Sequence, residues 1–301
     1  MFKTQLGVNC VMKRFSRRIL LGGIAVLPIA LQCSPGHAIE TYGPSNAYIT
    51  LVVTDPLALP LACSCVKGYA QRKYEKLADF LQSKLGKSVR VVWSESIENA
   101  KKEHGLDKKT VFIGKDSVVR FDSKKLKLEV TPFAQLTDVK GSVNQRGVFV
   151  VRRDNPAASL LDLEGYRVLW GPEKCNEKSA SPKSKLKELE IAIESEDVCD
   201  TCSVTARKLV EDSQATKVVG VISSYAERLL TGCGTIENGS LKVVGESDEV
   251  PFISVFLTEQ FSPDERKAIL EILLAVRSSS DLLAAMESKD GFVAYEEATH
   301  N

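Results

Sequence analysis

Histidine is scarce in this chain, which has only 3 among 301 residues. One of them, His37, lies in a stretch with the features of an export leader, so His104 and His300 remain for the body of the protein. General acid–base catalysis would then depend on carboxylates or lysines. We find no Ser–His–Asp arrangement, no glycine-rich phosphate loop and no carboxylate pair in a catalytic context. The sequence therefore indicates a protein that is not an enzyme.

The chain also lacks a strong net charge and, after residue 38, any long apolar run. It has 40 basic and 39 acidic residues, a formal net charge of +1. Five basic residues and no acidic one precede residue 39, so the remainder carries a charge of about −4. A nucleic-acid-binding surface would be strongly basic, which excludes that class of partner. No later segment has the roughly 20 apolar residues of a membrane span.

Residues 13–38 have the three parts of an export signal: a charged start, an apolar run and a small residue, Ala38, at the expected cleavage point. Residues 16–21 read Ser-Arg-Arg-Ile-Leu-Leu, which fits a twin-arginine signal; an ordinary Sec signal is the alternative. A start at Met1 or at Met12 is left open. We expect a soluble periplasmic protein.

A lipoprotein is less favoured. Cys33 follows Leu31-Gln32, and a lipid-attachment site calls for a small residue in place of the glutamine. Lipid anchoring is therefore less favoured than cleavage of the leader and release of the protein.

Segments with strand and helix patterns alternate along the rest of the chain. The predicted strands are 47–54, 88–93, 110–114, 128–134, 147–152, 167–170, 217–222, 241–245 and 251–257. The predicted helices are 69–85, 94–105, 202–211, one begun by Ser181-Pro182, one opened by residues 223–225, and a long one after the capping box of residues 262–265. A strand–helix–strand succession implies parallel sheets covered by helices.

The order of these segments predicts two lobes after a signal peptide at 1–38. Lobe one combines 39–137 with 251–301, and lobe two is 147–245. Two polar segments, 138–146 and 246–250, are the predicted hinges. Ligands of open α/β sheets bind beyond the carboxyl ends of the strands, so we expect a ligand cleft between the lobes.

Four stretches of the chain match the pattern of a known family in order and spacing. They are 74–89 (beginning Tyr-Glu-Lys-Leu-Ala-Asp-Phe-Leu), 111–117 (Val-Phe-Ile-Gly-Lys-Asp-Ser), 159–168 (Ser-Leu-Leu-Asp-Leu-Glu-Gly-Tyr-Arg-Val) and 218–225 (Val-Val-Gly-Val-Ile-Ser-Ser-Tyr). In these stretches the chain resembles the phosphate/phosphite/phosphonate substrate-binding proteins of ABC transporters. The resemblance implies an α/β, two-lobed type 2 periplasmic-binding-protein fold. Each lobe is then a mixed, mainly parallel sheet flanked by helices, and two hinge strands join the lobes.

The resemblance also implies a function and a set of ligand-binding residues. A protein of this family captures a small anion, phosphate- or phosphonate-like, and presents it to an ABC permease; we expect a monomer without a cofactor. Family members hold the oxyanion at a Ser/Thr-rich helix start in lobe two, which corresponds here to 173–181. This region keeps two serines but inserts acids and a cysteine. The candidate ligand-binding residues are Lys115, Ser117, Ser179, Ser181, Ser223, Ser224 and Tyr225. Each serine, taken alone, has the alternative role of a helix cap.

Six cysteines remain after the leader: Cys63, Cys65, Cys175, Cys199, Cys202 and Cys233. An even number in an exported protein favours disulfides, although 15 pairings are possible. The Cys-x-Cys and Cys-x-x-Cys spacings also suit a thiolate site for copper(I) or zinc, or a redox site. This gives the alternative function: an accessory protein of the same fold that docks on a periplasmic redox enzyme.

Overall fold

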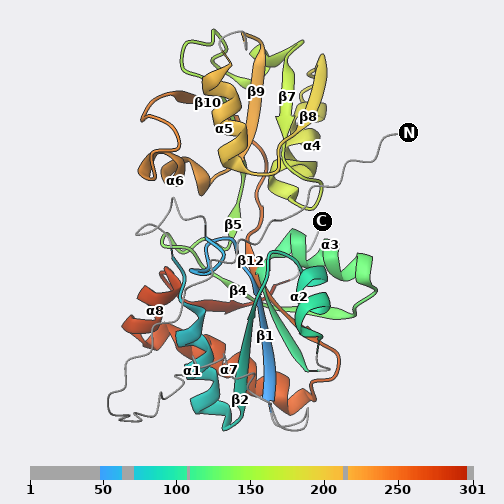
Figure 1. The fold of residues 1–301 in the computed structure, drawn as a ribbon, viewed down its shortest axis with the longest axis vertical. Helices are drawn as coiled ribbons and strands as arrows, with labels where there is room; N and C mark the ends of the chain where they lie inside the picture. Colours follow the sequence, from blue (N-terminus) through green and yellow to red (C-terminus); the bar gives the residue numbers. More distant parts are fainter. Residues whose placement is uncertain (1–47, 63–70, 107–108, 213–215, 297–301) are drawn as a thin grey trace, which may run out of the picture. The chain divides into compact units, whose positions relative to one another are not determined.

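The computed structural model describes residues 48–62, 71–106, 109–212 and 216–296. These residues form two α/β units, each built on its own sheet (Figure 1). The predicted leader at 1–38 and the pair Cys63 and Cys65 lie outside the described residues. Within the described part, no helix is long and apolar enough to cross a bilayer.

The first sheet has six strands in the order β13-β4-β12-β3-β1-β2. Their bounds are β1 (Tyr48–Thr54), β2 (Ser88–Trp93), β3 (Thr110–Lys115), β4 (Val130–Leu136), β12 (Ile253–Thr258) and β13 (Phe292–Ala294). β1 pairs in parallel with β2 and β3, whereas β12 runs antiparallel to β3 and β4. The strand β12 therefore returns from late in the chain to the middle of the sheet formed by its early strands.

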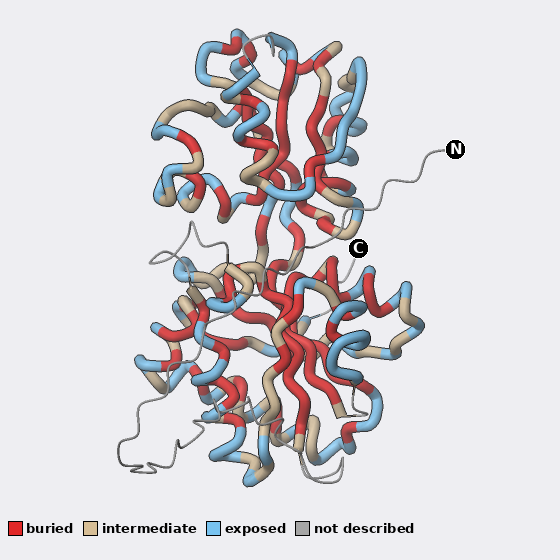
Figure 2. Tube along the Cα trace, viewed as in Figure 1, coloured by how far each residue is buried: buried red, intermediate tan, exposed pale blue. Residues whose placement is uncertain are grey.

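Helices cover both faces of the first sheet, as the alternation of its strand residues requires. The helices are α1 (Tyr74–Leu85), α2 (Ile97–His104), α3 (Asp116–Leu126), α7 (Pro263–Ala275) and α8 (Ser280–Met286), with a short turn η4 (Val276–Ser278) before α8. Leu51 and Val53 pack in the core with α1, α7 and α8, while Val52 packs with α2 and α3. Figure 2 shows the central strands β1, β3 and β12 buried and the outer sides of the helices exposed.

The second sheet has five strands in the order β10-β6-β9-β7-β8. Their bounds are β6 (Gly147–Arg152), β7 (Arg167–Trp170), β8 (Ser195–Val198), β9 (Val218–Ser223) and β10 (Leu241–Glu246). The helical segments around it are η2 (Leu160–Leu163), η3 (Asn176–Lys178), α4 (Ala180–Glu188), α5 (Cys202–Glu211) and α6 (Ala226–Gly232). Val148 and Val150 share a core with α5 and α6, and Phe149 shares the opposite core with Trp170 and α4.

The chain passes between the two sheets twice. The first passage is at β5 (Asn144–Gln145) and the second at β11 (Val250–Pro251), and these two short strands pair antiparallel. Residues 147–246 of the second sheet are therefore inserted between β4 and β12 of the first sheet.

Several predicted elements have the bounds that the sequence indicated, namely β2, β6, β7 and α5. The capping box before α7 is also present. The Glu265 N–H donates to Ser262 Oγ at 3.3 Å, and the Ser262 N–H donates to Glu265 Oε2 at 3.0 Å. Local signals of this kind act within a few residues, so they can be identified from sequence alone.

Other elements differ from the prediction for local reasons. Ser96, not Ser94, caps α2, because its side chain accepts the Asn99 N–H. α4 begins at Ala180, so Ser181 lies inside the first turn instead of at the cap. The expected long terminal helix is divided into α7, η4 and α8. The edge strand β8 was not predicted, because its sequence Ser-Glu-Asp-Val is exposed throughout and has no apolar alternation.

Candidate functional site

Residues from both sheets meet at one carboxylate. Lys115, the last residue of β3, donates a hydrogen bond from Nζ to Glu177 Oε1. Ser223, the last residue of β9, donates from Oγ to the same oxygen at 2.7 Å. Carboxyl ends of strands are where open α/β sheets bind ligands. The two strand ends therefore place a cation and a hydroxyl around a single anionic oxygen.

Lys115, Glu177 and Ser223 are buried, and the charged states of Lys115 and Glu177 depend on each other. Glu177 and Ser223 have no exposed surface and Lys115 is 5% exposed. Burial disfavours the charged form of Lys115, but attraction to Glu177 outweighs it and raises the lysine pKa. Burial likewise opposes ionisation of Glu177, yet Lys115 and the Ser223 hydroxyl lower the pKa of the carboxyl. The pair is therefore ionised at neutral pH.

Only one of the two Glu177 oxygens has a partner. Oε1 accepts both hydrogen bonds, while Oε2 is buried without a hydrogen-bond partner. A buried polar atom left unpaired costs free energy, about 1–3 kcal/mol in typical cases. The carboxylate thus keeps an unused acceptor in the buried site.

Two glycines fix the position of Glu177. A Cβ atom on Gly147 would lie 2.0 Å from the Glu177 carbonyl oxygen, so only glycine fits at the start of β6. A Cβ on Gly171 would lie 2.5 Å from Lys178 Cβ, and the Gly171 N–H donates to the Lys178 carbonyl at 2.9 Å. The short helical turn η3 therefore packs directly against the backbone of β6 and of the loop after β7.

Tyr225 and Cys202 complete the surroundings of Ser223. The Tyr225 ring stacks on Phe252, with centroids 5.0 Å apart and planes inclined by 19°. Burial raises the pKa of Tyr225, so its phenol is neutral and can donate a hydrogen bond. Cys202, the first residue of α5, accepts the Ser223 N–H on Sγ at 3.4 Å.

A cavity of about 340 Å³ opens beside this cluster, and residues of both units line it. Thr54, Leu57 and Lys115 contribute from the first unit, and Lys178, Cys202 and Tyr225 from the second. Thr54 ends β1, and its buried Oγ1 has no hydrogen-bond partner. A Cβ on Gly114 would lie 1.8 Å from that oxygen, so Gly114 makes the space that the hydroxyl occupies.

Four of the predicted ligand residues gather here. Lys115, Ser223 and Tyr225 are described above, and Ser117 Oγ accepts the Asn176 N–H at 3.2 Å, next to Glu177 in the chain. The remaining three candidates are placed differently.

Ser179 is buried at the N-cap of α4, without a side-chain cap bond. Ser181 Oγ donates to the Asp248 carbonyl at 3.0 Å, and Ser224 Oγ accepts the Arg146 N–H at 3.2 Å. A role for any candidate in ligand binding stays a prediction.

Thr54 and Glu177 belong to the site, yet sequence reasoning missed both. Thr54 stands at the end of the first predicted strand, where the rule on strand ends could have identified it. Glu177 was visible only as an inserted acid in the segment 173–181. Its contact with Lys115 spans 62 residues of sequence, and no local pattern encodes such a pairing.

Three of the described cysteines do not form the disulfides that the sequence predicts. Cys175, Cys199 and Cys202 are free thiols. Cys199 is buried in the core between the second sheet and α5 and α6, while Cys175 and Cys202 line the cavity. The disulfide prediction is therefore not confirmed for these three. Within the described ranges, no group of three or more His, Cys, Asp or Glu side chains could hold a metal ion.

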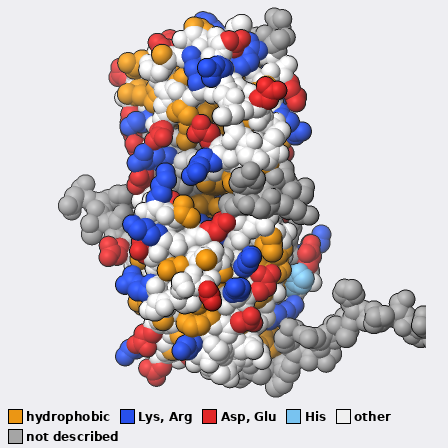
Figure 3. All heavy atoms as spheres, turned by 90° about the vertical axis from the view of Figure 1, so that its left-hand side faces the viewer, with side chains coloured by type: hydrophobic (Ala, Val, Ile, Leu, Met, Phe, Trp, Pro, Cys, Tyr) orange, Lys and Arg blue, Asp and Glu red, His pale blue; other side chains and the backbone are white. Residues whose placement is uncertain are grey.

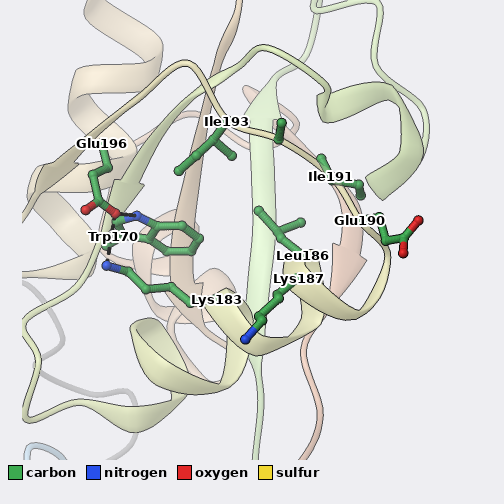
Figure 4. A pocket seen from close by; sticks show the side chains of 9 residues that line it. Trp170, Lys183, Leu186, Lys187, Glu190, Ile191, Ile193 and Glu196 are labelled. Carbon is green, nitrogen blue, oxygen red and sulfur yellow. Dashed lines mark hydrogen bonds and ion pairs between the residues drawn. The ribbon is translucent and has the colours of Figure 1, made fainter.

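A second hollow lies on the second unit, beside α4 and β8 (Figure 4). Trp170 Nε1 donates to Glu196 Oε2 at 2.7 Å, and Lys183 Nζ lies 2.9 Å from the same oxygen. The Lys183 ammonium also lies 5.3 Å from the centre of the Trp170 ring. The Lys183 and Glu196 side chains are about half exposed, so the hollow is a weaker candidate for an anion site than the buried strand ends at Lys115.

Among the described residues on the face that Figure 3 shows, no patch of a single charge sign stands out as a second candidate site. Basic and acidic side chains alternate there, in keeping with 40 basic and 39 acidic residues in the whole chain.

Comparisons with solved structures identify the class of the protein. A Xanthomonas citri protein bound to chloride matches with a TM-score of 0.62 and 13% identity, over 83% of this chain and 92% of that one. PhnD1 from Prochlorococcus marinus in complex with methylphosphonate matches with 0.60 and 12%, over 83% and 93%. A binding-protein component of an ABC phosphonate transporter from Pseudomonas aeruginosa matches with 0.59 and 12%, over 83% and 82%. At such identities the likeness concerns the fold, which is that of the two-lobed type 2 periplasmic binding proteins.

The family follows from the sequence. Residues 68–300 match the profile described as "ABC transporter, phosphonate, periplasmic substrate-binding protein". The chain belongs to this family of periplasmic substrate-binding proteins, which are transport components and not enzymes. No curated protein sequence matches the chain significantly.

The predicted resemblance, fold class and solute-binding role are thereby confirmed. Proteins of this family bind small ligands and work with ABC permeases. Nothing in the comparisons supports the alternative of a redox-enzyme accessory protein.

Proposed function

We propose that this protein is an exported receptor that binds a small phosphonate-class anion at the cavity beside Lys115 and delivers it to an ABC permease. The lobes are the two units built on the two sheets, with β5 and β11 as the hinge strands. The leader at 1–38 directs export, and the mature protein acts as a soluble monomer.

One observation carries this proposal: Lys115 and Ser223, from different sheets, converge on one anionic oxygen. A cation and a hydroxyl that share an oxygen form the kind of charge-assisted pair that holds carboxylate and phosphonate oxygens. The neutral Tyr225 phenol and the unpartnered Thr54 hydroxyl supply two further donors near the cavity.

Glu177 has a particular role in this proposal, because it already occupies the oxygen position between Lys115 and Ser223. A ligand oxyanion competes with Glu177 Oε1 for the same two donors. Ligand binding thus exchanges an internal anion for an external one at Lys115, and the displaced Glu177 carboxylate keeps the attraction of the neighbouring Lys178 charge.

The test is a thermal melt with methylphosphonate and with inorganic phosphate. A ligand that binds only the folded state stabilises it by RT ln(1 + [L]/Kd), about 2.7 kcal/mol at a concentration of 100 Kd. We expect methylphosphonate to raise the melting temperature of the wild type. Tyr225→Phe, which keeps the stacked ring but loses the hydroxyl, should reduce the rise.

Lys115→Met should abolish the rise, and Lys124→Met on the exposed side of α3 is its matched control. The proposal fails if neither anion shifts the melt of the wild type.

A further inference from the structure

The cavity beside Lys115 is much larger than a simple oxyanion requires. Its volume is about 340 Å³. A water molecule in the liquid has a share of about 30 Å³, so a phosphate-sized anion needs on the order of two such shares. Cavities of about 300 Å³ and more are typical of sites for organic ligands with many atoms. The dimensions alone thus leave most of the cavity unfilled by an inorganic anion.

The wall of the cavity is largely apolar, and both units contribute to it. Leu57 and Val118 line it from the first unit, and Leu229 and Leu230 line it from α6 of the second. Leu57, Val118 and Leu230 are each at most 6% exposed, so their contact surfaces lie inside the protein. The thiols of Cys175 and Cys202 add weakly polar surface to the same wall.

The charges at the cavity offer little net attraction to a bare anion. Lys115 is already neutralised by Glu177. Lys174 and Lys178 are the other basic residues that line the cavity, and the exposed acids Glu95 and Asp200 line it as well. The three acids, Glu177, Glu95 and Asp200, therefore balance the charge of the three lysines. Affinity for a bare oxyanion therefore has to come from a few hydrogen bonds.

We infer that the ligand is an organic phosphonate with an apolar substituent of about four to six carbon atoms, an inference that rests on the proposed function. Its phosphonate group binds at Lys115, and its hydrocarbon part fills the space along Leu57, Val118 and α6. Burying apolar surface supplies the affinity that the balanced charges do not. Each buried CH₂ should tighten binding by about fourfold.

The test is calorimetric titration of the whole protein with methylphosphonate, butylphosphonate and phenylphosphonate, and with inorganic phosphate. We expect affinity to rise from methyl to butyl by about sixtyfold, since three CH₂ groups are added, with phenylphosphonate at least as tight as butylphosphonate.

A matched pair of variants locates the effect. Leu229→Asn should weaken butylphosphonate by about tenfold and leave methylphosphonate nearly unchanged. Leu161→Asn, at a side chain that is 68% exposed and is not among those lining the cavity, should change neither. If Leu229→Asn does not fold, the affinities of the three phosphonates for the wild type still test the inference.

The outcomes separate the two proposals. Equal or falling affinity from methyl to butyl overturns the inference and leaves the proposed function intact. A rising series with an unaffected Leu229→Asn places the hydrocarbon elsewhere and also overturns it. If none of the four compounds binds, the proposed function fails, and this inference falls with it.

Discussion

Among the described residues, two ion pairs have both partners buried, and their comparison explains what the site can do. In the first unit, Arg72 Nη1 donates to Asp55 Oδ2 at 2.9 Å, and the Tyr74 hydroxyl donates to the same oxygen at 2.6 Å. Asp55 Oδ1 accepts the Leu57 N–H at 2.8 Å. Both oxygens of this carboxylate are therefore satisfied by residues of one unit.

The pair of Lys115 and Glu177 differs in both respects. It joins the two sheets, and Glu177 Oε2 is left without a partner. A buried charge that loses its partner costs free energy. The Arg72–Asp55 pair, in which both carboxylate oxygens are hydrogen-bonded, therefore resists replacement of one partner by another ion. In the incomplete pair, an anion that enters the cavity can replace Glu177 as the partner of Lys115. The contrast distinguishes an ion pair that maintains the fold from one that a ligand can replace.

The largest expected effect comes from breaking the complete pair. Arg72→Met leaves Asp55 charged, buried and without its main partner, and should lower the free energy of unfolding by about 3–5 kcal/mol. Denaturant unfolding measures this loss, with Arg277→Met on the exposed turn η4 as the control. Methylphosphonate should not restore the lost stability, because Asp55 is itself an anion. Restoration by the ligand would contradict the contrast between the two pairs.

Glu177→Gln should have a smaller effect that the ligand reverses. The variant leaves the Lys115 ammonium buried without a counter-charge, while the glutamine oxygen can still accept its hydrogen bond, so we expect a loss of about 3 kcal/mol in the absence of ligand. A phosphonate should then bind about tenfold more tightly than to the wild type, because it no longer competes with the Glu177 carboxylate. Melting curves with and without methylphosphonate give both quantities.

The matched control for Glu177→Gln is Glu173→Gln, at an exposed acid of the same segment. This control should leave both stability and affinity unchanged. Weaker binding by Glu177→Gln would mean that the carboxylate contacts the ligand directly instead of competing with it.

The smallest expected effect concerns the partly exposed ion pairs of Glu265 with Lys87 and Lys109, which serve as a reference for the two buried pairs. Glu265 accepts hydrogen bonds from Lys109 and Lys87, and with the Ser262 N–H these lower its pKa to about 2. Because the folded-state pKa is depressed, the stabilisation is present above the ordinary pKa of 4.5 and is lost as the pH falls from there towards 2.

Glu265→Gln should therefore cost about 1 kcal/mol at pH 7, the sum expected for a helix cap and screened ion pairs. The difference from the wild type should shrink as the pH falls from about 4.5 to about 2. Melting curves across this interval measure the change. A difference that stays constant with pH would show that the carboxylate charge is not its source.

Much of the fold was predictable because its determinants are local. Strand alternation, the strand–helix succession and the capping box at Ser262 each act within a short stretch of chain. The serine assigned as the cap of α2 was wrong by two residues, because Ser94 and Ser96 are equally good caps by type and only the backbone path selects Ser96. Patterns predict the existence of an element better than its first residue.

The site was predictable only in part. Lys115, Ser223 and Tyr225 were among the candidates that the family resemblance implied, and the structure places them at or just after the ends of β3 and β9, where such sheets bind ligands. Glu177 was not among them, since its partner lies in another unit and an acid is the opposite of what an anion site suggests. Asp55 directly follows the first predicted strand, and no sequence pattern marked it as a partner for a buried arginine. Only the structure pairs it with Arg72 and Tyr74.

The chain has only two tryptophans, and their positions give it a built-in pair of optical reporters. Trp93 lies edge-on to Tyr74 at 6.3 Å in the first unit, and Trp170 donates to Glu196 in the second. A single Trp→Phe substitution would therefore leave fluorescence from one unit alone. Emission recorded on each variant during unfolding could then show whether the two halves lose their structure together or one after the other.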